Sequence, residues 1–140
     1  MRRYETIYIL RPSLNEEQIN TIVDNSNSIV TDGNGKIIEL DRWGMRKLAY
    51  PIRKELQGFY IFCDYSAEPE AVAEMERKFR IEDAVLRYMT VKTADAISDE
   101  EIAEATDKAA NKKIVSEETE ESADEESSVE NDDADTSEEE

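Results

Sequence analysis

The residue types that most often carry chemistry in small proteins are scarce in this chain. Its 140 residues include no histidine and a single cysteine, Cys63. Without histidine the usual general base and proton shuttle is missing, and one cysteine forms neither an intramolecular disulfide nor a thiolate metal site. Cys63 ends the apolar run Phe59–Cys63, which predicts a buried structural thiol rather than a reactive one. We therefore expect no cofactor and no metal.

Carboxylates are abundant, but their distribution does not indicate catalysis. Residues 1–93 hold 15 Asp and Glu against 14 Lys and Arg, whereas residues 94–140 hold 20 against 3. The acids of the first part are spread over expected helices and turns, where a solvated face is the simpler interpretation, and those of the second part have no scaffold that would raise their pKa values. The acidity of the chain belongs to its carboxyl-terminal part, so RNA binding by residues 1–93 stays open.

Hydrophobic periodicity predicts the order strand, helix, strand, strand, helix, strand. The expected elements are a strand from Tyr4, a helix capped by Asn15 and Gln18 that ends before Asp32–Gly35, a strand over Lys36–Leu40, a strand over Gly58–Tyr65, a helix from Pro69, and a strand over Asp83–Lys92. The segment Asp41–Leu56 looks irregular, because Gly44 and Pro51 interrupt it. The third strand has two apolar faces, as expected either of a central strand whose second face is also covered or of a strand that meets a partner.

This order favours an α+β fold, the ferredoxin-like βαββαβ sandwich, in which two helices cover one face of a four-stranded antiparallel sheet. After it, Ser98–Glu101 forms a capping box that predicts a short helix to about Lys113. From Ser116 the chain is almost entirely Glu, Asp, Ser and Thr, which predicts a disordered acidic tail. The expected organisation is a domain over 1–93, a linker with a possible short helix over 94–115, and the tail over 116–140.

Two functions of such folds can be tested against the sequence. A phosphate-cradling enzyme loop after the first strand would need glycines, but Arg11–Leu14 has none. An RNA-recognition motif would place aromatic residues for base stacking on the third strand, but Gln57–Asp64 keeps only the glycine and the first aromatic, and Asp64 occupies a stacking position. This strand suits protein packing better than base stacking.

The segment Trp43–Ile52, with the sequence WGMRKLAYPI, resembles the signature of ribosomal protein six of the bacterial small subunit. Met1–Thr6, Gly58 with Tyr60, and Val85–Tyr88 also match that family, so the resemblance covers residues 1–93. Asn34–Gly35 departs from the family's paired glycines. The resemblance implies the ferredoxin-like fold and a structural, non-enzymatic role on the ribosome. It also implies binding of 16S ribosomal RNA in the central domain of the small subunit, jointly with ribosomal protein eighteen.

The resemblance also suggests which residues bind RNA, namely the basic residues of the matching motifs. They are Arg2, Arg3, Arg46, Lys54, Arg80, Arg87 and Lys92. Because the last strand should lie beside the first, we expect Arg2 and Arg3 to form one basic surface with Arg87 and Lys92, extended by Arg80. Arg46 and Lys54 form a second group. The residues expected to meet a protein partner are Tyr60, Phe62 and Tyr88, on strands whose two faces are apolar.

An alternative from another class is a ferredoxin-like regulatory module that binds a small metabolite and oligomerises through its sheet. Clustered arginines argue against it, because a metabolite sensor has no need of them. An enzyme acting through a carboxylate is a more distant alternative. The tail is either a solubilising extension, or a segment that RNA repels and that engages basic ribosomal proteins. The start of the chain has no signal-peptide pattern and no stretch approaches a membrane span, so we expect a cytoplasmic, ribosome-associated protein with neither a membrane nor a small-molecule substrate as partner.

Overall fold

The computed structural model describes residues 1–127, with side chains as far as Val115. Its elements are β1 (Arg2–Leu10), α1 (Glu16–Asp32), β2 (Lys36–Ile52), β3 (Glu55–Ala67), α2 (Pro69–Ile81), β4 (Val85–Ala94) and α3 (Asp99–Ser127). The chain divides into two compact units, Met1–Thr106 and Asp107–Glu140, and the first contains the entire sheet. None of the helices in residues 1–127 is long and apolar enough to cross a membrane.

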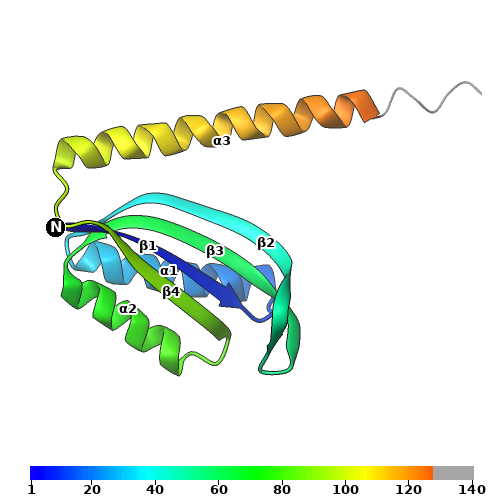
Figure 1. The fold of residues 1–140 in the computed structure, drawn as a ribbon, viewed down its shortest axis with the longest axis horizontal. Helices are drawn as coiled ribbons and strands as arrows, with labels where there is room; N and C mark the ends of the chain where they lie inside the picture. The colour runs from blue at the N-terminus through cyan, green and yellow to red at the C-terminus, as the bar shows by residue number, and fades with distance from the viewer. Residues whose placement is uncertain (128–140) are drawn as a thin grey trace, which may run out of the picture. The chain divides into compact units, whose positions relative to one another are not determined.

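The four strands form one antiparallel sheet in the order β2-β3-β1-β4. Helices α1 and α2 cover the same face of this sheet (Figure 1), which we call the helix face, and the opposite face is called the second face. This arrangement confirms the predicted ferredoxin-like βαββαβ sandwich. Strand β3 lies between β2 and β1, so the central position that its apolar sequence predicted is confirmed.

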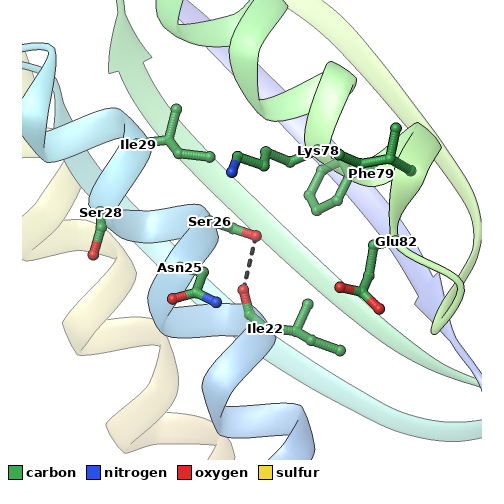
Figure 2. Close-up of a pocket in the computed structure, with 9 residues that line it drawn as sticks. Ile22, Asn25, Ser26, Ser28, Ile29, Lys78, Phe79 and Glu82 are labelled. Carbon is green, nitrogen blue, oxygen red and sulfur yellow. Dashed lines mark hydrogen bonds between the residues drawn. The ribbon is translucent and has the colours of Figure 1, made fainter.

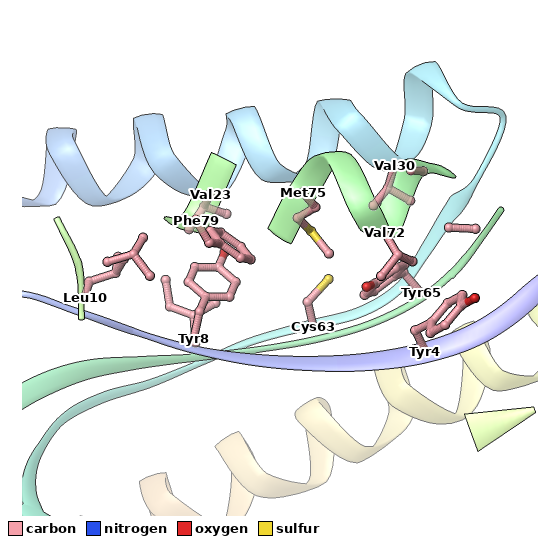
Figure 3. Close-up of a cluster of buried hydrophobic side chains, with 14 of the residues drawn as sticks. Tyr4, Tyr8, Leu10, Val23, Val30, Cys63, Tyr65, Val72, Met75 and Phe79 are labelled. Carbon is pink, nitrogen blue, oxygen red and sulfur yellow. The ribbon is translucent and has the colours of Figure 1, made fainter. Parts of the chain in front are cut away.

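The main core lies between the sheet and the two helices. Side chains on a strand alternate between faces, and Tyr4, Tyr8 and Leu10 of β1 all point to the helix face (Figure 3). They pack with residues of β3, α1 and α2, including Cys63, Tyr65, Val23, Val30, Val72, Met75 and Phe79. By the same alternation, Ile7 and Ile9 of β1 belong to the second face.

The helix starts follow the sequence signals. The Asn15 side chain accepts a hydrogen bond from the Gln18 amide (2.8 Å), and the Gln18 side chain accepts one from the Asn15 amide (3.0 Å), which confirms the capping box. Pro69 opens α2 as predicted. Helix α1 ends at Asp32, one residue later than predicted, and β4 begins at Val85 rather than Asp83 because Asp83 and Ala84 form a turn.

Strand β2 is much longer than predicted, because it continues past Leu40 to Ile52. Gly44 has φ +85° and lies at a register shift, so it forms part of a β-bulge rather than ending the strand. Pro51 is tolerated because β2 is an edge strand and its pairing with β3 is irregular between Lys47 and Ile52. The expected irregular segment 41–56 instead lies within a long β2–β3 hairpin and includes its turn.

Helix α3 begins with the predicted capping box, in which the Ser98 hydroxyl accepts from the Glu101 amide (3.2 Å) and the Glu101 carboxylate accepts from the Ser98 amide (2.7 Å). The helix runs to Ser127, past the predicted end near Lys113. Its sequence contains no glycine or proline and many Glu and Ala, which favour helix. The predicted boundary between linker and tail therefore falls inside α3, and residues 128–140 of the predicted tail lie outside the described residues.

Candidate nucleic-acid interface

An aromatic cluster occupies the second face of the sheet. The Trp43 ring stacks on Phe62, with centroids 5.7 Å apart and planes 5° apart, and on Tyr60, with centroids 6.5 Å apart. Tyr60 pairs with Ile9 and Phe62 with Ile7 in the β1–β3 ladder, which places both aromatic residues opposite the helix face. All three rings are half-buried. The cluster therefore offers flat, partly accessible apolar area to a binding partner.

A β-bulge accounts for the position of Trp43. The β2–β3 register pairs Arg42 with Ile61 and then Gly44 with Tyr60, so Trp43 is the extra residue. The positive φ of Gly44 is a backbone conformation that glycine adopts without strain. A Cβ at Gly44 would meet no atom within 4 Å, so the glycine is required for its backbone conformation and not for space. The Trp43-Gly44 pair of the signature thus places the indole over β3.

The end of the β2–β3 hairpin folds across the second face. Leu48 of β2 forms a small buried cluster with Ile9 of β1 and Leu86 of β4, although β2 and β4 are opposite edges of the sheet. Gly58 permits this packing, because a Cβ there would lie 2.3 Å from the Ile9 Cγ2 atom. The fold-over brings the cations of the signature segment to the start of β4.

Two arginines lie against aromatic rings of this region. The guanidinium carbon of Arg46 is 4.9 Å from the Trp43 ring centroid, and that of Arg87 is 5.8 Å from the Tyr50 centroid. These distances are those of cation–π interactions, and such an interaction holds the guanidinium in place without neutralising its charge. Both arginines are exposed, and within residues 1–115 neither forms a salt bridge. Their charge is therefore available to phosphate groups.

Arg46 and Arg87 are joined at this end by further cations. We define the hairpin cations as Arg46, Lys47, Arg53, Lys54 and Arg87, all of them exposed. Arg53 contacts Asp83 in the turn before β4, with 3.7 Å between its Nη1 and the Asp83 carboxylate. Of the five, Arg46, Lys54 and Arg87 were candidates from the sequence, whereas Lys47 and Arg53 were not. Arg53 was missed because Arg-Lys is not a turn signal.

The remaining candidates do not join this group. Arg3 lies at the opposite end of β1, and Lys92 pairs with Tyr4 near it, whereas Arg87 pairs with Ile9. A strand rises about 3.3 Å per residue, so Arg3 and Ile9 are about 20 Å apart. The structure therefore does not bring Arg2 and Arg3 into one basic surface with Arg87. Lys92 forms a salt bridge with Asp95, and Arg3 forms one with Asp64.

Arg80 and Tyr88 lie near the helix face instead. The Arg80 guanidinium donates a hydrogen bond to the Tyr88 hydroxyl (3.3 Å), and the Tyr88 ring is 5.6 Å from that of Phe79 in α2. Tyr88 pairs with the core residue Tyr8 across the β1–β4 ladder. Of the three residues expected to meet a protein partner, Tyr60 and Phe62 share the second face, and Tyr88 does not. The apolar residues of β4 that are exposed are Met89 and Val91, at 58% and 47%.

A pocket of about 480 Å³ lies between α1 and α2 (Figure 2). Ile22, Ile29 and Phe79 line it, together with the charged Lys78 and Glu82. The Ser26 hydroxyl in its wall donates its hydrogen bond to the Ile22 carbonyl oxygen (2.9 Å). Within the described residues, no three His, Cys, Asp or Glu side chains gather to hold a metal ion. The pocket is a shallow gap between helices and does not collect the charged groups of the hairpin end.

The fold and this face define the class of protein: a ferredoxin-like α+β domain whose second face combines an aromatic cluster with exposed arginines held against aromatic rings. The family model described as ribosomal protein S6 matches residues 3–92, and the chain belongs to this family. It is 57% identical over 106 residues to small ribosomal subunit protein bS6 of Desulfotalea psychrophila, covering 75% of this chain and 67% of that protein.

Other relatives agree with this assignment. The bS6 protein of Caldanaerobacter subterraneus is 42% identical over 95 residues, which is 68% of this chain and 100% of that protein. The crystal structure of 30S ribosomal protein S6 from Thermotoga maritima superposes with a TM-score of 0.61 at 30% identity, over 65% of this chain and 86% of that one. The resemblance of residues 1–93 to ribosomal protein six is thereby confirmed.

Proposed function

We propose that this chain is a non-enzymatic structural component of the small ribosomal subunit that binds 16S ribosomal RNA in the central domain together with ribosomal protein eighteen. As a member of a small-subunit ribosomal protein family it works on the ribosome, in the bacterial cytoplasm. The observation that carries the proposal is the pair Arg46 and Arg87, each held against an aromatic ring and without a salt bridge among residues 1–115. Cations in this state gain most from RNA phosphates, because no carboxylate has to be displaced.

The protein partner is assigned to the second face on chemical grounds. Tyr60 and Phe62 are half-buried there, and Met89 and Val91 expose apolar area on β4. Ile7 of β1, which lies between these strands, pairs with both Phe62 and Met89 and so connects the two parts. Contiguous apolar surface of this kind usually marks a site of interaction. A partner on this face would lie next to Arg87, so partner and RNA would meet at one end of the domain. This adjacency supports joint rather than independent binding.

The test is binding of the full chain to a central-domain fragment of 16S ribosomal RNA at several salt concentrations, with and without ribosomal protein eighteen. We expect binding that requires the partner and weakens with salt. Arg46→Gln with Arg87→Gln should lower the log–log salt slope by about 0.7–0.9 for each phosphate that the variant no longer neutralises. The matched control removes two cations from α2, as Arg77→Gln with Lys78→Gln, and should leave the slope unchanged. Absence of binding by the folded wild-type chain in every condition would overturn the proposal.

A further inference from the structure

The tip of the β2–β3 hairpin has an unusual backbone for its sequence. Ile52 and Glu55 are the last paired residues, so Arg53 and Lys54 alone form the loop. Both have positive φ, 48° for Arg53 and 67° for Lys54. A two-residue hairpin loop with positive φ at both positions is a type I′ turn, which strongly prefers Asn-Gly. Two long side chains therefore occupy positions where glycine or asparagine would be unstrained.

Strain of this kind persists where surrounding contacts enforce it, and it gathers at functional sites. Here the contacts are clear. Arg11 donates from Nε to the Asp83 carbonyl oxygen (2.8 Å) and reaches the Glu55 carboxylate at 3.5 Å. Arg53 also lies against Asp83, at 3.5 Å from its carbonyl oxygen. The base of the turn is thus tied to the loop before β4, and the turn is held in one place.

The two side chains of the turn remain open to a ligand. Both are exposed, and within residues 1–115 Lys54 forms no salt bridge. Arg53 uses only Nη1 in its contacts with Asp83, a residue whose side chain is itself 90% exposed. Apart from this exposed contact of Arg53 with Asp83, neither cation forms a hydrogen bond or salt bridge within residues 1–115. What the turn gains from Arg-Lys instead of Asn-Gly is two positive charges at the outermost point of the hairpin.

We propose that the Arg53-Lys54 turn is a phosphate-binding tip that contacts the RNA backbone beyond the surface formed by Arg46 and Arg87. This inference rests on the proposed function and deepens it. The backbone of the turn is strained, but this conformation projects the positive charges of Arg53 and Lys54 outward from a fixed base. The ligand is the phosphate backbone, read through charge and position and without base contacts.

This inference can be tested by giving the turn an unstrained sequence that lacks the two charges. Arg53→Asn with Lys54→Gly supplies the preferred type I′ sequence and removes both charges. We expect the melting temperature of this variant to rise by roughly 4–8 °C, because the strain is relieved. We expect its log–log salt slope for the same 16S RNA fragment, with the partner present, to fall by about 1.4–1.8. Arg53→Lys with Lys54→Arg keeps the charges and should bind as the wild type does.

A second variant separates charge from strain. Arg53→Gln with Lys54→Gln keeps side chains of similar length and removes only the charges, so its slope should fall as far as that of the Asn-Gly variant. Unchanged binding in both neutral variants, with wild-type binding intact, would overturn this inference and leave the proposed function standing. If the wild-type chain itself fails to bind RNA, the proposed function and this inference fall together.

Discussion

The guanidinium of Arg3 in β1 donates two hydrogen bonds to the carboxylate of Asp64 in the neighbouring strand β3. They run from Nε to Oδ1 at 3.0 Å and from Nη2 to Oδ2 at 2.6 Å. The Asp64 side chain is 6% exposed and that of Arg3 is 31% exposed. The hydrogen bond to Asp64 is also the main reason that the pKa of Arg3 is raised. The charge of Arg3 is therefore already neutralised within the domain, and this residue is a weak candidate for phosphate binding.

Arg3→Gln should destabilise the domain without weakening RNA binding. The substitution leaves the Asp64 carboxylate buried without its cation, which costs about 2 kcal/mol of unfolding free energy, less than for a fully buried pair because Arg3 is partly exposed. Urea unfolding measures this loss. Arg2→Gln is the matched control, since Arg2 is exposed, and its unfolding free energy should stay within about 0.5 kcal/mol of wild type. A fall in the salt slope for Arg3→Gln would return Arg3 to the RNA-binding set.

Two buried tyrosines should respond differently to removal of their hydroxyl groups. The Tyr65 hydroxyl lies 2.9 Å from the Thr6 hydroxyl, whereas the buried Tyr8 hydroxyl forms no hydrogen bond of good geometry with the described residues, although the Ser26 hydroxyl lies near it. Tyr65→Phe should lose about 1 kcal/mol of unfolding free energy. Tyr8→Phe should be neutral or gain up to about 1 kcal/mol, because it removes an unsatisfied polar group. Equal losses in the two variants, measured by urea unfolding, would show that the Tyr8 hydroxyl has a partner.

The stability of the domain should fall at alkaline pH. Burial raises the pKa of the Cys63 thiol to about 12 and also raises the pKa values of Tyr8 and Tyr65. Because these groups ionise in the unfolded chain first, their contribution is fully present below the unfolded thiol pKa, about 8.5. It is then lost as pH rises toward the folded value. The slope from Cys63 alone is about 1.4 kcal/mol per pH unit once the unfolded thiol is ionised.

Unfolding free energies measured between pH 8 and pH 10 test this slope. Cys63→Ala is the control, since it removes the thiol and should make the decline shallower by the amount that Cys63 contributes. The same burial predicts that a thiol reagent modifies Cys63 only when the domain unfolds. Modification of the native domain at pH 8, at the rate of an exposed thiol, would contradict the burial argument.

The fold followed from the sequence where local signals and burial agree. The Asn15–Gln18 capping box, Pro69 at the start of α2 and the apolar third strand each have a local cause, and each is confirmed. The extension of β2 did not follow, because Gly44 and Pro51 break strands in most settings. They are tolerated here by a bulge and an edge position, and both depend on which strand becomes the neighbour.

The candidate site was harder to predict than the fold, because side-chain direction depends on register. In the sequence, Tyr88 resembles Tyr60 and Phe62, because all three are aromatic residues on strands with two apolar faces. The β1–β4 register, however, pairs Tyr88 with Tyr8 and so directs it to the helix face. The contact of Arg87 with Tyr50 joins opposite edges of the sheet. That contact forms only because the end of the hairpin folds across the second face, and the hydrophobic pattern of the sequence does not predict this fold-over.

Gly44 provides the clearest test of how the signature segment builds the second face. Its φ of +85° costs a residue with a Cβ about 1 kcal/mol, although a Cβ there would touch nothing. Gly44→Ala should therefore lower the unfolding free energy by about 1 kcal/mol, and Gly44→Asn by less, because asparagine tolerates positive φ. Trp43, the single tryptophan, reports the geometry: if the bulge disappears, the indole no longer stacks on Phe62 and its fluorescence shifts toward that of exposed indole. A Gly44→Ala variant with wild-type stability and emission would show that the bulge does not depend on glycine, and that Trp43 is positioned by β3 alone.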